Sequence, residues 1–376
     1  MGLRLKNVSR IVQGQYYLRD IDISLERGSF NVLMGRTLAG KTSLMRVVAG
    51  LDQPSSGRVE MDGVDVTGVP VQKRKISMVY QQFINYPNLS VFENIASPLR
   101  IAGDANSTIK DKVESIAEML HIEDYLQRRP LELSGGQQQR TAMARALVKD
   151  SDLILFDEPL VNLDYKLREE LRFELRELFK RRNVIAVYAT TEANEALALG
   201  GVTTLMHEGR IIQSGPVSEV YRKPNTIEAA ELFSEPAINI IAGIVKQQSV
   251  LLENGVGFNL AQHKALVDGP YRFGIRPHHL TLERHNGDDV TMNLNVDVAE
   301  ISGSETYLHM TSNSLSLVSQ LNGVLPFHTD TQVKVYFSPH TLYVFNLEGE
   351  TVSMPRDRGQ SSTAAAPKPA EVMSHD

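Results

Sequence analysis

Residues 35–42 read Gly-Arg-Thr-Leu-Ala-Gly-Lys-Thr, and this octapeptide decides the fold of the first part of the chain. It matches the pattern G-x-x-x-x-G-K-[ST] of a phosphate-binding loop. The apolar run 30–34 before it predicts a buried strand, and residues 43–49 after it predict a helix. Because the pattern needs a strand before it and a helix after it, this context favours a nucleotide-binding loop over a glycine-rich turn without a ligand.

Each position of the octapeptide has an expected role. Gly35 and Gly40 allow the backbone to curl so that several N–H groups point at phosphate oxygens, and the start of the helix adds partial positive charge. Lys41 is expected to reach the β- and γ-phosphates of ATP, and the Thr42 hydroxyl is expected to bind Mg²⁺. The predicted nucleotide contacts are Gly35, Arg36, Thr37, Leu38, Ala39, Gly40, Lys41, Thr42 and Ser43.

A second apolar run, residues 153–156, ends in two adjacent carboxylates, Asp157 and Glu158. At the end of a strand, Asp157 can hold Mg²⁺ directly or through water, and Glu158 can orient or deprotonate an attacking water. A strand that ends in Asp-Glu-Pro is by itself only a turn. Together with the upstream phosphate loop, it predicts the second half of an ATP-hydrolysing site.

The rest of the chain predicts two folded domains and a tail. Apolar β-type runs alternate with helical patterns over residues 1–235, which predicts α/β layers around a largely parallel sheet. Within it, residues from about 93 to 150 have helical patterns and few strand patterns, so a helical subdomain is expected there. Residues 236–356 carry β-type runs broken by Gly, Asn and Asp, which predict an antiparallel all-β domain, a small barrel or sandwich. Residues 357–376 have almost nothing to bury and are expected to be disordered.

Composition excludes several classes of protein. The absence of cysteine excludes disulfides and thiolate metal sites, and it fits a reducing cytosol. The formal net charge of −6 disfavours a nucleic-acid partner, because phosphate backbones call for a basic face. No run approaches the roughly 20 apolar residues that span a bilayer, so any membrane association is expected to come through a partner protein. The adjacent His278 and His279 have no third ligand at metal-site spacing and predict no metal site.

A second glycine motif points to a site shared between subunits. Residues 133–140 read LSGGQQQR and precede a helical pattern. Ser134 can cap that helix, and two glycines leave backbone N–H groups bare, which makes another anion site. One nucleotide needs one cradle, so a second cradle implies a composite site. The motif LSGGQ upstream of the Asp-Glu strand end resembles the signature of ABC ATPases, which implies that Ser134, Gly135, Gly136 and Gln137 contact the ATP of a partner subunit.

The resemblance extends over roughly residues 1–350. Gln81 resembles the glutamine that touches Mg²⁺ and relays nucleotide state to transmembrane partners, and Asp164 resembles the acidic residue that faces the other subunit. The segments GIRP (274–277) and GSET (303–306) resemble the accessory domain of carbohydrate-type importer ATPases, such as the maltose and glycerol-phosphate systems. The implied fold is a P-loop NTPase with a RecA-like core and helical subdomain, followed by an OB-like, TOBE-type all-β domain.

The resemblance also implies a function. The phosphate loop and the stretch QKRKISMVYQQFINYP (72–87) are similar to those of bacterial glycerol importer ATPases. The chain is thus expected to hydrolyse ATP with Mg²⁺ and to power import of a small polyol or sugar-type solute. Its expected partners are a second ATPase subunit and transmembrane permease subunits at the cytoplasmic face of the bacterial inner membrane. A non-transport ABC ATPase and a regulatory subunit that never hydrolyses ATP are the alternatives.

Three positions depart from the family pattern. Thr191 stands where the family usually has a histidine that contacts the γ-phosphate, and Val161 stands where a serine is usual near the partner's site. The aromatic residue expected near position 12 to stack on adenine is missing, although Tyr16 and Tyr17 follow shortly. A Thr hydroxyl is shorter than imidazole and cannot become cationic, so the site that uses this chain's phosphate loop, Glu158 and Thr191 is expected to turn over slowly or not at all. We therefore expect a heterodimer with unequal sites, and the alternative is a homodimer that tolerates Thr191.

Overall fold

The computed structural model describes residues 2–161, 163–181, 183–260, 266–312 and 315–355. It divides into two compact units, Met1–Ala237 and Ile238–Asp376, which are described separately. The predicted disordered tail lies outside the described residues. No helix among the described residues has the length and apolar character needed to cross a membrane.

A mostly parallel sheet of six strands forms the centre of the first unit. Its strands lie in the order β10-β9-β3-β8-β7-β6, and all neighbours are parallel except β9 and β10. β7 and β8 are buried along their whole length, as expected for strands covered on both faces. The strands are β3 (Phe30–Met34), β6 (Ile76–Val79), β7 (Leu153–Asp157), β8 (Ile185–Thr190), β9 (Val202–His207) and β10 (Arg210–Pro216).

Two hydrophobic cores cover the two faces of this sheet. Val32 and Met34 of β3 point into a core that includes α5 and α6, whereas Leu33 points into the other core with α1. This alternation follows from the two-residue period of a strand. The helices of the sheet are α1 (Lys41–Ala49), α5 (Tyr165–Arg181), α6 (Ala193–Leu199), α7 (Val217–Arg222) and α8 (Ile227–Leu232), with a short 3₁₀ turn η1 (Val71–Lys73).

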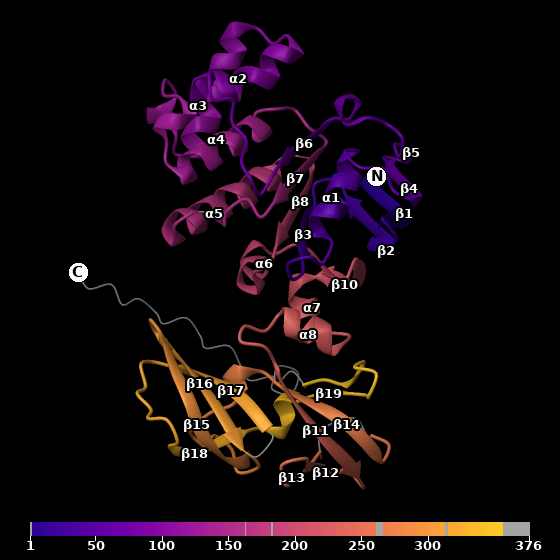
Figure 1. Cartoon of the computed structure of the whole chain (residues 1–376), viewed down its shortest axis with the longest axis vertical. Helices are drawn as coiled ribbons and strands as arrows, with labels where there is room; N and C mark the ends of the chain where they lie inside the picture. The colour runs from indigo at the N-terminus through magenta and orange to yellow at the C-terminus, as the bar shows by residue number, and fades with distance from the viewer. Residues whose placement is uncertain (1, 162, 182, 261–265, 313–314, 356–376) are drawn as a thin grey trace, which may run out of the picture. The chain divides into compact units, whose positions relative to one another are not determined.

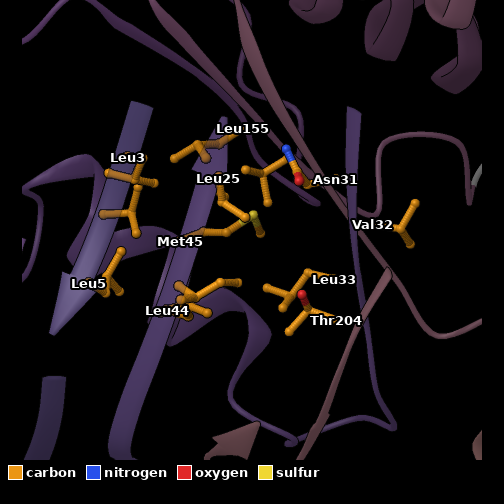
Figure 2. A pocket seen from close by; sticks show the side chains of 13 residues that line it. Leu3, Leu5, Leu25, Asn31, Val32, Leu33, Leu44, Met45, Leu155 and Thr204 are labelled. Atoms are coloured by element: carbon orange, nitrogen blue, oxygen red, sulfur yellow. The ribbon is translucent and has the colours of Figure 1, made fainter. Parts of the chain in front are cut away.

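A small antiparallel sheet in the order β2-β1-β4-β5 closes the core around α1. Figure 2 shows Leu44 and Met45 of α1 between Leu3 and Leu5 of β1 and Leu33 of β3. The small gap between these side chains is almost entirely apolar, so it is a packing space without the polar groups that orient a ligand. The strands are β1 (Gly2–Val12), β2 (Gln15–Glu26), β4 (Ser56–Met61) and β5 (Val64–Asp65).

Three further helices form a separate layer of the first unit and lie together in Figure 1. They are α2 (Val91–Ala102), α3 (Asn106–Met119) and α4 (Gly135–Leu147), with 3₁₀ turns η2 (Glu123–Tyr125) and η3 (Pro130–Glu132). Ser90 caps α2 by accepting from the Glu93 N–H at 3.2 Å. Side chains of all three helices join the hydrophobic core that also contains α5.

The second unit is all-β in its described residues apart from two 3₁₀ turns. Two antiparallel sheets, in the orders β13-β12-β11-β14-β19-β20 and β17-β16-β15-β18, share one hydrophobic core. The first contains β11 (Asn239–Lys246), β12 (Ser249–Leu252), β13 (Gly257–Asn259), β14 (Gly269–Ile275), β19 (Tyr343–Phe345) and β20 (Thr351–Ser353). The second contains β15 (Val290–Ser302), β16 (Glu305–Ser312), β17 (Leu315–Asn322) and β18 (Gln332–Phe337); the turns are η4 (Pro277–His279) and η5 (Pro339–Thr341). The prediction that an α/β fold is followed along the chain by an all-β fold is confirmed.

Candidate nucleotide-binding and hydrolysis site

The topology of the six-stranded sheet brings the predicted site residues together. β3, β8 and β7 are adjacent and parallel, with Met34 opposite Thr190 and Asp157 opposite Ala189. The segments that follow these strands therefore leave the sheet at the same edge. The Gly35 N–H donates to the Thr190 carbonyl at 3.3 Å, which joins the phosphate loop to the end of β8.

The phosphate loop needs its two glycines for steric reasons. A Cβ on Gly35 would lie 2.5 Å from the Met206 carbonyl oxygen, and one on Gly40 would lie 2.9 Å from the Tyr17 carbonyl oxygen. Gly40 also has a φ of 102°, which L residues rarely adopt. Because this left-handed residue ends the loop, α1 begins at Lys41, two residues earlier than the sequence pattern predicted.

Leu38 is the strained residue of this loop. Its φ is 67° and its side chain is 95% exposed. A non-glycine residue in the left-handed region costs about 1–3 kcal/mol, and such residues concentrate at ligand-binding segments.

The Lys41 ammonium lies inside the loop rather than in water. Its side chain is 5% exposed, and Nζ lies 3.4 Å from the Glu158 carboxylate. Nζ also donates to the carbonyls of Gly35 at 2.8 Å and Arg36 at 3.3 Å. Burial lowers the pKa of Lys41, and the nearby Glu158 opposes that shift. The loop therefore holds a cation at the place where the phosphates of a nucleotide are expected.

Thr42 and Asp157 meet beside this lysine. The Thr42 hydroxyl donates to the Asp157 carboxylate at 2.8 Å. Burial raises the pKa of Asp157, and the hydrogen bond from Thr42 opposes that shift. A hydroxyl and a carboxylate are oxygen donors of the kind that Mg²⁺ takes together with phosphate oxygens, so the donor set fits Mg²⁺ with a nucleotide.

Glu158 is held between two residues of the predicted site. Its carboxylate accepts from the Gln81 side-chain amide at 2.9 Å and pairs with Lys41. Its backbone has a φ of 49°, in the left-handed region, and its N–H donates to the Ala189 carbonyl at 3.1 Å. Gln81 was predicted to touch Mg²⁺, and in the structure its amide nitrogen contacts the catalytic candidate Glu158.

The cleft over the phosphate loop contains two tyrosines whose role the sequence left open. Tyr16 and Tyr17 line it and are 48% and 46% exposed. β1 and β2 form a hairpin in which Ile11 lies opposite Tyr16. Tyr16 is therefore the cross-strand neighbour of Ile11, whereas Val12 lies opposite Gln15. The other residues that line the cleft are Gln15, Thr37, Leu38, Ala39, Gly40, Lys41, Thr42, Ser43, Gln81, Glu158, Glu208 and Gly209.

The LSGGQ motif lies apart from this cleft. Ser134 caps α4 and forms a capping box with Gln137, with hydrogen bonds of 3.3 Å and 2.9 Å. Gly135 is exposed, and a Cβ placed on it would meet no atom within 4 Å. The cleft of this chain is not lined by any of the predicted partner contacts, which are Ser134, Gly135, Gly136, Gln137 and Asp164.

Thr191 and Asp164 occupy two exposed segments of the first unit. Thr191 directly follows β8, and Asp164 begins α5 by accepting from the Leu167 N–H at 3.0 Å. Val161 is 43% exposed. Thr191 does not line the cleft described above, although the segments before and after it are tied to the phosphate loop and to α5.

A phosphate loop between strand β3 and helix α1, with two carboxylates at the end of β7, the second parallel strand from β3, defines the class of P-loop ATPases. Comparison with known proteins narrows the class. The family model described as ABC transporter matches residues 18–161. The sn-glycerol-3-phosphate import ATP-binding protein UgpC of Yersinia enterocolitica is 34% identical over 354 residues, which cover 92% of this chain and 97% of that protein.

A second UgpC and a solved ATP-binding cassette are also similar to this chain. UgpC of Vibrio cholerae is 33% identical over 359 residues, covering 94% of this chain and 95% of that protein. A solved dimeric ATP-binding cassette, in a post-hydrolysis state bound to ADP and Pi, is 27% identical with a TM-score of 0.53; it covers 57% of this chain and 98% of that one. The chain belongs to the ATP-binding proteins of ABC transporters, and it is an ATPase that hydrolyses ATP to drive transport. The predicted fold class, with a TOBE-type second domain, is confirmed.

Proposed function

We propose that this chain powers an importer for a small polyol or sugar-type solute, with glycerol favoured, from the cytoplasmic face of the bacterial inner membrane. The observation that carries the proposal is similarity over nearly the whole chain, second unit included, to proteins named for import of sn-glycerol 3-phosphate. The phosphate loop and residues 72–87 favour glycerol within this group. Uptake by the reconstituted transporter, compared between glycerol and glycerol 3-phosphate, tests the solute.

We infer that ATP lies along the cleft over the phosphate loop. Residues 35–43 contact its phosphates, Lys41 supplies the buried positive charge, and Thr42, Asp157 and Gln81 hold Mg²⁺. Bound Mg²⁺ would neutralise phosphate charge as the γ-phosphoryl leaves. Glu158 orients and deprotonates the attacking water, and its contacts with Gln81 and Lys41 support its placement at the phosphates.

The complete site requires a second cassette. The helix start at 134–137 does not line the cleft of its own chain. Its first two residues, Ser134 and Gly135, are exposed, and Gly136 and Gln137 are half-buried, which supports contact with a nucleotide held by a partner. Asp164 is exposed as well and is assigned to the same interface. The dimeric state of the solved relative supports this assembly.

The two composite sites are proposed to be unequal. Thr191 follows β8 beside the phosphate loop, and its hydroxyl can donate one neutral hydrogen bond at most to the transferring phosphoryl. A charged imidazole would stabilise that group more strongly. The site made by this chain's loop is therefore slow, and its intact LSGGQ completes a fast site on a different partner ATPase. A homodimer that tolerates Thr191 is the second candidate.

The first test is Mg-ATP hydrolysis by the chain alone and with its candidate partner ATPase, measured beside ATP binding. Binding without turnover by the lone chain, with activity restored by the partner, is the expected result. The substitution Thr191→His is expected to raise turnover at this chain's own site by about tenfold or more. Fast hydrolysis by the unmodified lone chain would instead establish the homodimer.

A groove beside the helical layer is the proposed docking place for the permease subunits. It runs between β6, α2 and α4 and is lined by Tyr80, Phe83, Ile84, Ile101, Arg145 and Lys149 among others. Ile101 is 88% exposed and Ile84 is 64% exposed, so the groove presents apolar side chains next to Gln81. A short permease helix seated there would sense nucleotide state through Gln81 and Glu158.

The two tyrosines of the cleft give a separate expected result. We infer that Tyr16 stacks on adenine, because it lines the cleft opposite Ile11. Tyr16→Ala is expected to weaken ATP binding about tenfold, since a stacked base contributes about 1–3 kcal/mol. Binding of inorganic triphosphate should stay unchanged, because it lacks the base. Tyr17→Ala shows whether the neighbouring ring carries the contact instead, and Tyr165→Ala, on exposed α5 surface, is the control.

A further inference from the structure

A cluster of charged and hydroxyl side chains includes both neighbours of Thr191 in the chain, and none of its members lines the cleft over the phosphate loop. It joins the end of β8 and the start of α6 to α5, and we name it the β8–α5 cluster. Its members are Tyr188, Thr190, Glu192, Glu195, Arg168 and Arg172. Nothing in the sequence pattern assigned a role to these residues, because their contacts join two separate elements.

The inner half of the β8–α5 cluster is built on Glu195. Its side chain is 6% exposed, and its carboxylate accepts from the Tyr188 hydroxyl at 2.6 Å and from the Thr190 hydroxyl. Arg172 supplies the neutralising charge, with Nε 3.4 Å from Glu195. A buried carboxylate needs such partners, so this half fixes the Thr190 side chain firmly. The Thr190 carbonyl accepts from the Gly35 N–H, and the position of Thr191 is thereby set from one side.

The outer half of the cluster holds the residue after Thr191. The Glu192 N–H donates to the Thr190 hydroxyl oxygen at 3.0 Å. The Glu192 carboxylate accepts from Arg168 Nη1, at 3.2 Å and 3.3 Å to its two oxygens. The second terminal nitrogen of Arg168, Nη2, donates to the Leu163 carbonyl at 3.2 Å. One guanidinium therefore joins the chain just after Thr191 to the chain just before Asp164.

We propose that Arg168 is a positioning residue for ATP hydrolysis, which holds Thr191 and Asp164 at a fixed separation. The planar fork of an arginine suits this task, because its terminal nitrogens can serve a carboxylate and a carbonyl at once. Thr191 belongs to the site of this chain, and Asp164 is assigned to the contact with the partner cassette. The proposal rests on the proposed function in both assignments, that of Thr191 to the site and that of Asp164 to the partner contact. Through Arg168, a shift of Asp164 on docking of the partner reaches the segment that carries Thr191.

We expect the Arg168–Glu192 pair to fix the position of Thr191 rather than to stabilise the folded chain. The two side chains are 22% and 40% exposed, and partly exposed ion pairs contribute little to the free energy of unfolding. Hydrolysis depends far more steeply on placement, because a displacement of about 1 Å can cost about a hundredfold in rate. Variants of this pair should therefore change turnover more than they change melting temperature or nucleotide affinity.

Hydrogen exchange tests the link without reference to activity. In the full-length Arg168→Met variant, amide exchange in residues 190–193 and in residues 163–168 is expected to become about tenfold faster or more, because both segments lose the same tether. Arg176→Met is the matched control, since Arg176 lies on the same helix and is exposed. Unchanged exchange in either segment of Arg168→Met would refute the tether.

Hydrolysis at this chain's own site in the active assembly tests the role in catalysis. Arg168→Met and Glu192→Gln are each expected to lower the kcat of that site about tenfold, with ATP binding unchanged. The double variant should be no slower than Glu192→Gln alone, because Glu192 also pairs with Arg172 at 3.8 Å and its replacement removes both ion pairs. Arg168→Lys should recover little of the lost kcat, since a single ammonium cannot serve both the Glu192 carboxylate and the Leu163 carbonyl. Normal kcat in Arg168→Met, or equal losses of kcat, ATP affinity and melting temperature, would refute the proposal, whereas an inactive wild-type assembly would refute the proposed function instead.

Discussion

Glu158→Gln is expected to lower ATP turnover at this chain's own site by about 10²–10⁴-fold, the usual contribution of a general base. The amide has nearly the shape of the carboxylate but cannot take a proton from water. Glu158 lies within reach of both Gln81, at 2.9 Å, and Lys41, at 3.4 Å, so its carboxylate is next to the phosphate-binding cation. The change therefore removes proton transfer while leaving the phosphate loop in place.

ATP binding by the Glu158→Gln variant should be at least as tight as in the unmodified chain. In the structure the Glu158 carboxylate is an ion partner of Lys41, and a phosphate must share that ammonium with it. A neutral amide competes less for the same cation. Loss of turnover together with retained binding would separate a role in proton transfer from a role in nucleotide binding.

Single-turnover hydrolysis of Mg-ATP, measured beside equilibrium binding, distinguishes a loss of proton transfer from a loss of nucleotide binding. Glu118→Gln is the control, because Glu118 lies on the exposed surface of α3 and does not line the cleft. That variant should hydrolyse ATP at the rate of the unmodified chain. If Glu158→Gln kept turnover within a few-fold of the unmodified chain, Glu158 would not be the base of the site that turns over.

The sequence predicted those parts of the site that are local in the chain. The phosphate loop, Asp157 and Glu158 each combine a strand end with the residues that follow it, so the apolar runs place them. Parallel order of β3, β8 and β7 then brings these strand ends to one edge, as in other α/β sheets with a ligand at the carboxyl ends of the strands.

Contacts that depend on register or on distant elements were not predictable. Tyr16 reaches the cleft because it pairs with Ile11 across the β1–β2 hairpin, and the pattern of apolar residues does not specify that register. Arg168 and Glu192 are 24 residues apart in the chain and meet only when α5 packs on the sheet. In the second unit, alternation predicted individual strands but not the pairing of β14 with β19.

Lys41→Met is expected to weaken ATP binding by about 10–100-fold, because a hydrogen bond to a charged group contributes about 1.5–3 kcal/mol and the lysine serves more than one phosphate oxygen. Methionine keeps the apolar stem and removes only the ammonium. The variant should not be less stable in the absence of nucleotide. Burial lowers the pKa of Lys41, so folding disfavours its charged form at neutral pH, and that penalty disappears with the charge.

The same pKa shift sets the pH dependence of binding. Only the protonated lysine attracts phosphate, and its charge is lost as pH rises through the folded-state pKa. Because that pKa lies below the ordinary lysine value, ATP affinity of the unmodified chain should begin to fall at a lower alkaline pH than an ordinary lysine would allow. Lys41→Met should show no such fall, whereas Lys110→Met, on the exposed surface of α3, should retain it. Equal binding by Lys41→Met and the unmodified chain would mean that the phosphates are held by backbone N–H groups alone.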